Sequence, residues 1–152
     1  MIKYKNYLII LFIFLVSCGY SPILSVKESN FSINNIEFVS ANKMNSKIQN
    51  ELKIYKNSIN KSKIYNLIIA TDKNKKVSMR DSKGDPKIFV MNMSVDIEVI
   101  ESGLTKSKRK FSEEFSYNNN ENKFDLSRYE ENIENNIINK LVERIISYLH
   151  SI

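Results

Sequence analysis

Apolar and polar residues alternate most regularly between Phe89 and Val99, where every second residue is apolar and the intervening residues from position 92 onward are Asn, Ser, Asp and Glu. A period of two is typical of a β-strand with one buried and one exposed face. Residues 105–117 repeat the pattern with Phe111, Phe115 and Tyr117 on the apolar side. Because Ser102-Gly103-Leu104 can reverse the chain, the two segments predict an antiparallel hairpin.

The hairpin register follows from pairing the apolar residues with each other. If Glu101 faces Thr105 across a three-residue loop, Val95 faces Phe111 and Met91 faces Phe115. The same register places Asp96 opposite Lys110 and Glu98 opposite Lys108, which are favourable cross-strand pairs. Glu113 falls on the apolar side, and the sequence offers no reason for it there.

Two further strands precede this hairpin. Residues 31–40 alternate imperfectly, with a change of phase at Asn34-Asn35 that a β-bulge explains. Residues 64–71 are apolar and rich in β-branched side chains, which is typical of a strand inside a sheet. The segment 57–62 predicts a turn, and the polar segment 72–86 predicts a basic loop.

Apolar residues at helical spacing predict two amphipathic helices. The first contains Met44, Ile48, Leu52 and Tyr55, and either Ser40 or Asn42 can cap it. The second is long and runs from an expected N-cap at Asp125 to the end of the chain. Its apolar stripe consists of Leu126, Tyr129, Ile133, Ile137, Ile138, Leu141, Val142, Ile145, Ile146 and Leu149. His150 is expected to cap the last turn or to face water.

This order of elements, β-α-β-β-β-α, predicts an α+β fold: a two-layer sandwich in which two helices cover one face of a four-stranded mixed sheet. A right-handed crossover between parallel strands would place the loops after the first, second and fourth strands at the end opposite the N-terminal tether. With 152 residues, of which 42% are hydrophobic, the chain has enough apolar material for one core.

The N-terminus has the pattern of a bacterial export signal. Lys3 and Lys5 precede an apolar run over 7–16, which is too short to span a bilayer as a helix. Leu15-Val16-Ser17-Cys18 then resembles the lipobox of bacterial lipoproteins at every position. We expect residues 1–17 to be a signal peptide, Cys18 to carry covalent lipid, residues 18–30 to form a tether, and residues 31–152 to form the domain. The alternative to lipidation is that Cys18, the one cysteine of the sequence, is a buried free thiol in a short signal anchor.

Catalytic and nucleic-acid-binding functions find little support. The chain has one His, no second Cys, no Gly-rich phosphate loop and no metal-ligand spacing, so we predict that it is not an enzyme and needs no cofactor beyond the lipid. The formal charge is +6, but acidic residues are interleaved with basic ones and export removes the nucleic-acid target.

The segment Cys18-Gly19-Tyr20-Ser21-Pro22 resembles the opening of the LptE family of lipopolysaccharide-assembly lipoproteins. The expected element order, the NELKIYKN stretch and the long final helix are also similar to that family. The resemblance implies an outer-membrane lipoprotein on the periplasmic face that plugs and stabilises a large lipopolysaccharide-exporting β-barrel of the LptD type. Gly19 rather than Asp after the cysteine favours the outer membrane by the same resemblance.

The resemblance also suggests a lipopolysaccharide contact, for which the basic segment is the candidate because Lys and Arg bind phosphorylated sugars through charge-assisted hydrogen bonds. The alternative for these residues is a solvated connection, and for the whole protein an independent periplasmic lipoprotein that binds a small ligand or serves an envelope transporter. Lys106, Lys108, Arg109 and Lys110 form a second basic run, but the register assigns two of them to ion pairs. The candidate residues for the contact are Lys73, Lys75, Lys76, Arg80, Lys83 and Lys87.

Overall fold

The computed structural model describes residues 29–59 and 61–152, which form one four-stranded sheet covered by two α-helices. The strands are β1 (Phe31–Phe38), β2 (Lys63–Arg80), β3 (Pro86–Glu101) and β4 (Leu104–Asn118). The helices are α2 (Lys43–Leu52), which continues into a 3-10 turn at Lys53–Tyr55, and α3 (Lys123–Ser151). The predicted α+β class and element order are therefore confirmed, while the signal peptide, Cys18 and the tether up to residue 28 lie outside the described residues.

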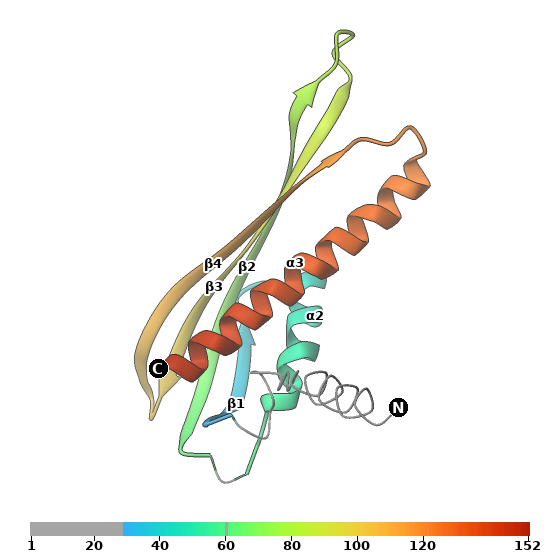
Figure 1. Cartoon of the computed structure of the whole chain (residues 1–152). Helices are drawn as coiled ribbons and strands as arrows, with labels where there is room; N and C mark the ends of the chain where they lie inside the picture. Colours follow the sequence, from blue (N-terminus) through green and yellow to red (C-terminus); the bar gives the residue numbers. More distant parts are fainter. Residues whose placement is uncertain (1–28, 60) are drawn as a thin grey trace, which may run out of the picture.

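The sheet has the order β1-β2-β3-β4, with β1 parallel to β2 and the other neighbours antiparallel. Both helices lie on the same side of the sheet (Figure 1). Since β1 and β2 start at the same end, the described chain enters opposite the β2–β3 turn (Figure 1). The short β1 stops beside Ile69, so the loop that follows it lies midway along the sheet and not at the far end with the other two.

The core lies between the sheet and the helices. Alternate residues of β3 from Met91 to Val99 are buried, as the period of two predicts. They pack with Tyr65, Leu67 and Ile69 of β2 and with the apolar stripe of α3, in which Leu141, Ile145 and Leu149 are fully buried. Tyr129 and Phe115, expected in the core, are instead 48% and 42% exposed. Tyr117, which lies nearer the distal end of the same strand as Phe115, is buried because the rings of Phe89 and Tyr129 pack against it.

The predicted hairpin register is confirmed over most of β3 and β4, including Met91 opposite Phe115, Val95 opposite Phe111 and Asp96 opposite Lys110. The expected loop is wrong by one residue. Glu101 pairs with Leu104 across the two-residue turn Ser102-Gly103, and a bulge restores the register at Val99. Both turn residues have positive φ, 53° and 83°, as a tight right-twisted hairpin requires.

Local signals at the helix starts were partly right. Asn42 caps α2, with its side chain accepting from the Asn45 amide at 3.0 Å. For α3 the expected cap was wrong. The side chain of Asn122, not that of Asp125, accepts hydrogen bonds from the free amides of Phe124 and Asp125, so the helix begins at Lys123.

The bulge predicted in β1 is present, between Ile33 and Asn35.

The largest difference from the sequence-based expectation is the length of β2. Residues 72–80, predicted as loop, continue the strand and pair with β3 from Ser94 to Pro86. Only Asp81–Asp85 remain as a turn, in which the Asp81 carboxylate accepts from the Lys83 and Asp85 amides, both at 2.9 Å. Gly84 supplies the left-handed residue, with φ +89°. The hairpin tip therefore projects beyond the start of α3 (Figure 1).

Candidate functional site

The strand conformation separates the six candidate basic residues. Lys73 and Lys75 continue the parity of Ile69 and Thr71, so they lie on the helix side of β2. Lys76 falls on the opposite face, Arg80 and Lys83 lie at the tip, and Lys87 lies on β3. The structure does not bring these six side chains together.

Acidic residues of α3 engage the two lysines on the helix side. Lys73 Nζ lies 2.5 Å from Glu134 Oε2, and Lys75 Nζ lies 2.5 Å from Glu130 Oε1. Glu134 also faces Lys47 of α2 at 3.8 Å. Because Glu130 and Glu134 are one helical turn apart, they match lysines spaced two residues along the strand. These contacts, which we call the ionic ladder, attach the first half of α3 to the sheet.

Tyr117 of β4 joins the ladder from the other side. Its hydroxyl donates to Glu130 Oε1 at 2.8 Å. Burial, with the neighbouring Glu130 carboxylate, raises the pKa of Tyr117 well above its usual 10. Lys75 Nζ also lies 4.2 Å from the centre of the Phe89 ring, a cation–π contact. Lys73 and Lys75 thus have partners within the chain, and an anionic ligand would have to displace them.

The remaining four basic residues lie at the tip or next to it. Arg80 donates to the Gly84 carbonyl oxygen at 2.8 Å, which closes the turn. Lys87 lines a cleft of about 670 Å³ between the hairpin and the start of α3, together with Asp81, Asp85, Pro86, Phe89, Asn118, Asn119, Glu121 and Lys123. Three acidic and two basic side chains share this cleft, so its charge is mixed.

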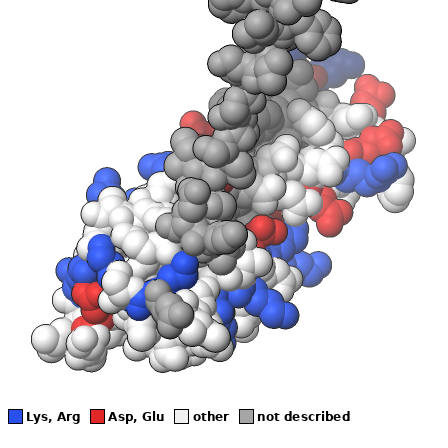
Figure 2. All heavy atoms as spheres, turned by 60° about the horizontal axis from the view of Figure 1, so that its bottom comes forward, with Lys and Arg blue, Asp and Glu red and all other residues white. Residues whose placement is uncertain are grey.

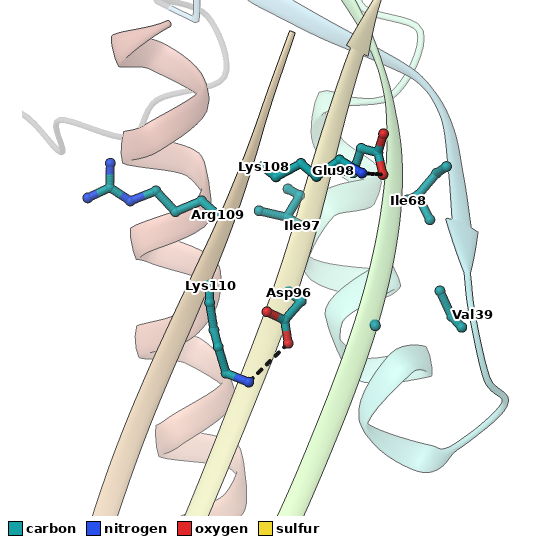
Figure 3. A pocket seen from close by; sticks show the side chains of 9 residues that line it. Val39, Ile68, Asp96, Ile97, Glu98, Lys108, Arg109 and Lys110 are labelled. Carbon is teal, nitrogen blue, oxygen red and sulfur yellow. Dashed lines mark ion pairs between the residues drawn. The ribbon is translucent and has the colours of Figure 1, made fainter. Parts of the chain in front are cut away.

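A second depression lies on the sheet face away from the helices (Figure 3). It has a volume of about 330 Å³ and an apolar floor that includes Val39, Ile68 and Ala70. Two cross-strand ion pairs border it: Lys108 with Glu98 at 2.8 Å and Lys110 with Asp96 at 3.2 Å. Hydrogen bonds from Lys108 and then Thr105 lower the pKa of Glu98, so that this carboxyl stays charged. The polar pairs and apolar floor make this groove amphipathic.

Charges elsewhere are dispersed. In the view that brings the base of Figure 1 forward, Lys and Arg side chains lie scattered among acidic and uncharged residues (Figure 2). Within residues 29–59 and 61–152 no group of three potential metal ligands converges, and no helix there is long and apolar enough to cross a membrane. His150, expected to cap or face water, instead packs against Phe31 in a T-shaped arrangement with the ring centres 5.0 Å apart.

Sequence reasoning missed the ladder because its partners are about sixty residues apart. The signal for the long hairpin was nevertheless present: Asp81-Ser82-Lys83-Gly84-Asp85 has turn residues at the positions of a three-residue hairpin loop. The register of β2 and β3 then follows outward from that turn. Residues 72–80 were predicted as loop because they are mostly polar, although two of their side chains pair with α3.

The described chain combines a four-stranded sheet that has one parallel edge with a long projecting hairpin and a long final helix on the same face as α2 (Figure 1). The chain is similar to the crystal structure of rare lipoprotein B from Shewanella oneidensis, with a TM-score of 0.60 and 13% identity over 78% of this chain and 95% of that one. It is also similar to a minor lipoprotein from Acinetobacter baumannii, with a TM-score of 0.59 and 12% identity over 79% and 91% of the two chains.

A solution structure of lipoprotein B from Nitrosomonas europaea gives a TM-score of 0.58 at 8% identity, over 81% of this chain and 86% of that chain. No protein-family model matches the sequence, and no curated protein matches it. At these identities the similarity establishes the fold that this chain shares with the three lipoproteins.

Proposed function

We propose that this protein is an outer-membrane lipoprotein, anchored through Cys18 on the periplasmic face, which plugs and stabilises a lipopolysaccharide-exporting β-barrel. The observation that carries the proposal is the agreement between a lipoprotein-type N-terminus in the sequence and a domain whose fold is similar to that of solved lipoproteins. The resemblance of Cys18-Gly19-Tyr20-Ser21-Pro22 to the LptE family supplies the particular role.

The architecture is suited to a plug. The lipid would hold the end at which the described chain enters, and the β2–β3 hairpin would project away from it (Figure 1). Outside the hairpin turn, β2 is paired along its length, and internal ion pairs hold α3 to the sheet. A domain of this kind can enter a barrel lumen without exposing a long unpaired strand at the tip.

Isolation of the protein from its native membrane in mild detergent tests the proposal. We expect a stoichiometric complex with a large β-barrel protein, identified by mass spectrometry. Intact mass should show acyl chains on Cys18 and no residues 1–17. Recovery as a free monomer, under conditions that preserve other barrel complexes, would contradict the plug and favour the independent periplasmic lipoprotein. An unprocessed N-terminus would contradict the lipid anchor.

We propose further that any lipopolysaccharide contact involves the tip and not the ladder. Lys76, Lys83 and Lys87 have no ion-pair partner among the described residues, whereas Lys73 and Lys75 are paired with α3. Phosphate binding costs less free energy at a cation without a partner, because no existing ion pair has to be broken. The basic tip, defined as Lys76, Arg80, Lys83 and Lys87, is therefore the stronger candidate.

Binding of purified lipopolysaccharide at low salt, measured on two charge-neutralised variants, tests this assignment. The tip variant changes Lys76, Arg80, Lys83 and Lys87 to Gln, and the ladder variant changes Lys73 and Lys75 to Gln. We expect the tip variant to weaken binding at least tenfold and the ladder variant to change it less than threefold. Unchanged binding by the tip variant would contradict the assignment. Circular dichroism of both variants controls for folding.

A further inference from the structure

The two edges of the sheet differ in how they are covered. At the β1 edge the chain folds back, and Lys56 forms a parallel bridge with Ile33. The Asn57 amide also donates to the Ile33 carbonyl oxygen at 3.0 Å, and the Ser32 hydroxyl donates to the Tyr55 carbonyl oxygen. The main-chain groups in the middle of this edge are therefore occupied within the chain.

The β4 edge is longer and largely uncovered. The strand has 15 residues, and most of its side chains are exposed. Within the part of the chain that the structure describes, Arg144 makes the single side-chain hydrogen bond to the main chain of β4, from Nη1 to the Ser112 carbonyl oxygen at 3.1 Å. An open edge of this length presents a row of amide and carbonyl groups to another strand.

Lysines usually protect such an edge by repulsion, but here the three lysines of β4 are neutralised by β3. Lys106 lies 2.6 Å from Glu101, Lys108 lies 2.8 Å from Glu98, and Lys110 lies 3.2 Å from Asp96. All three acids are direct or near neighbours in the β3–β4 register. The edge is therefore less repulsive toward another strand than its sequence indicates.

If two copies of β4 lie antiparallel, the basic residues of each copy can face the acidic residues of the other. Basic residues occupy 106–110, and acidic residues occupy 113 and 114. In antiparallel pairing centred on Phe111, Lys108 faces Glu114 of a second copy and Arg109 faces Glu113 of a second copy. Lys108 is already paired with Glu98 and Glu113 with Arg144 in their own chains, so each contact across the join would extend an existing ion pair. Each pair occurs twice because the arrangement is symmetric, and paired residues share a face because their positions have the same parity. Lys110 then faces Ser112, so no like charges are opposed at the centre.

We propose that the β4 edge pairs with β4 of a second copy of this chain, which joins two four-stranded sheets into one eight-stranded sheet with all helices on the same face. Opposite charges directly across an antiparallel pair stabilise it, whereas like charges destabilise it, so the register is set by Lys108 and Glu114. Arg144 lies at the join, where it pairs with Glu113 at 2.5 Å and donates to the Ser112 carbonyl oxygen. Pairing of the two strands would have to share or release this hydrogen bond, because Ser112 faces Lys110 of the second copy.

This pairing does not depend on the proposed function. A copy with β4 bound to a second copy and a copy inside a barrel are two separate states of the protein. The first is detected by association of two differently tagged copies, and the second by the presence of a barrel protein. Either result can be positive while the other is negative.

A charge-exchange experiment tests the register. Full-length copies with two different tags are expressed together, extracted in mild detergent and isolated through one tag. We expect wild type to capture wild type, while Glu114→Lys captures itself at least fivefold less, because the introduced lysine would face Lys108. Lys108→Glu should fail to capture itself for the matching reason. A Glu114→Lys copy should capture a Lys108→Glu copy as well as wild type captures itself, since opposite charges again face each other at both sites.

The control is Glu37→Lys, a charge reversal on the distant strand β1, which should leave capture unchanged. Thermal unfolding of Glu114→Lys and Glu37→Lys should show midpoints close to that of wild type. Lys108→Glu should unfold at a lower temperature, because its new carboxylate faces Glu98 within the chain, so recovery of the mixed pair, and not self-capture alone, decides the register for this variant. Failure of wild type to capture wild type would overturn the proposal. Equal capture by Glu114→Lys with itself, or failure of the mixed pair to recover, would overturn it as well.

Cysteine cross-linking in membranes provides a second measurement that detergent cannot affect. One tagged copy carries Lys110→Cys and the other carries Ser112→Cys, two exposed positions that face each other in the proposed register. On mild oxidation we expect a disulfide that joins the peptides containing residues 110 and 112. The absence of this linked peptide, or equal yields from every pair of cysteine variants, would contradict the register.

Discussion

Asn42 holds the start of α2 through two contacts at the residue scale. Its side-chain oxygen accepts from the Asn45 amide at 3.0 Å, and its side-chain nitrogen donates to Thr71 at 2.8 Å. We expect Asn42→Ala to lower the free energy of unfolding by about 1–2 kcal/mol, as loss of an N-cap does. Urea unfolding measures the change. Asn50→Ala, on the exposed face of the same helix, should cost less than about 0.5 kcal/mol.

Tyr117 should make stability sensitive to alkaline pH. Burial and Glu130 raise its pKa in the folded protein, so the folded state holds the phenolic proton more tightly than the unfolded state does. This contribution is complete below the unfolded pKa of about 10 and is lost as pH rises through the folded value. We expect the stability difference between wild type and Tyr117→Phe to shrink between pH 9 and pH 11. Urea midpoints at each pH measure it; Tyr129→Phe is the exposed control, and a difference that grows would contradict the prediction.

Glu113 shows what residue-level reasoning on the sequence could not supply. The period of two places Glu113 on the helix face, and that placement is correct. Its partner, Arg144, lies thirty-one residues further along the chain and pairs with it at 2.5 Å. Periodicity assigns a residue to a face, but it carries no information about which residue of another element lies opposite. The same limit concealed Glu130 and Glu134 as partners of the lysines on β2.

At the scale of elements, α3 is attached to the sheet in two different ways. Its second half buries Leu141, Ile145 and Leu149 completely. We expect Leu141→Ala to cost about 2–5 kcal/mol, because a cavity remains where the side chain packed. Thermal or urea unfolding measures the loss, and Leu104→Ala, at a position that is 76% exposed, should cost less than about 0.5 kcal/mol. Equal effects would contradict the assigned core.

The first half of α3 depends more on the ionic ladder and should therefore respond to salt. Partly exposed ion pairs weaken with ionic strength, since the Debye length falls to about 3 Å at 1 M salt. We expect hydrogen exchange in residues 123–134 to accelerate between 0.05 M and 1 M NaCl, whereas residues 141–149 change little. Lys73→Met with Lys75→Met should remove the salt effect on 123–134. A uniform response along the helix would contradict the two modes of attachment.

The length of the β2–β3 hairpin explains the main error at this scale. Residues 72–80 contain five charged side chains, so their composition resembles a loop. Two of those charges face acids of α3, and the rest lie on exposed positions of a paired strand. Strand formation there depends on the partner strand and on the turn Asp81–Asp85. The apolar strands, in contrast, could be recognised from their own pattern.

For the whole molecule, the fold class, the element order and most of the β3–β4 register were predictable because each follows from periodicity that survives folding. The candidate site was not. Six basic residues close together in sequence are distributed over two faces and a tip, since alternate residues of a strand point in opposite directions.

The parallel pairing of β1 with β2 has a geometric consequence. The described chain begins at one end of the sheet, and the 18 residues of β2 lead to the other. At about 3.3 Å per residue, this strand spans about 60 Å. If a surface holds the residues before Ser29, the length of β2 sets the distance between that surface and the hairpin tip. Removing two residues from β2 and two from β3 would bring the tip about 7 Å closer to the surface. The remaining side chains would keep their faces, because the side-chain period of a strand is two residues.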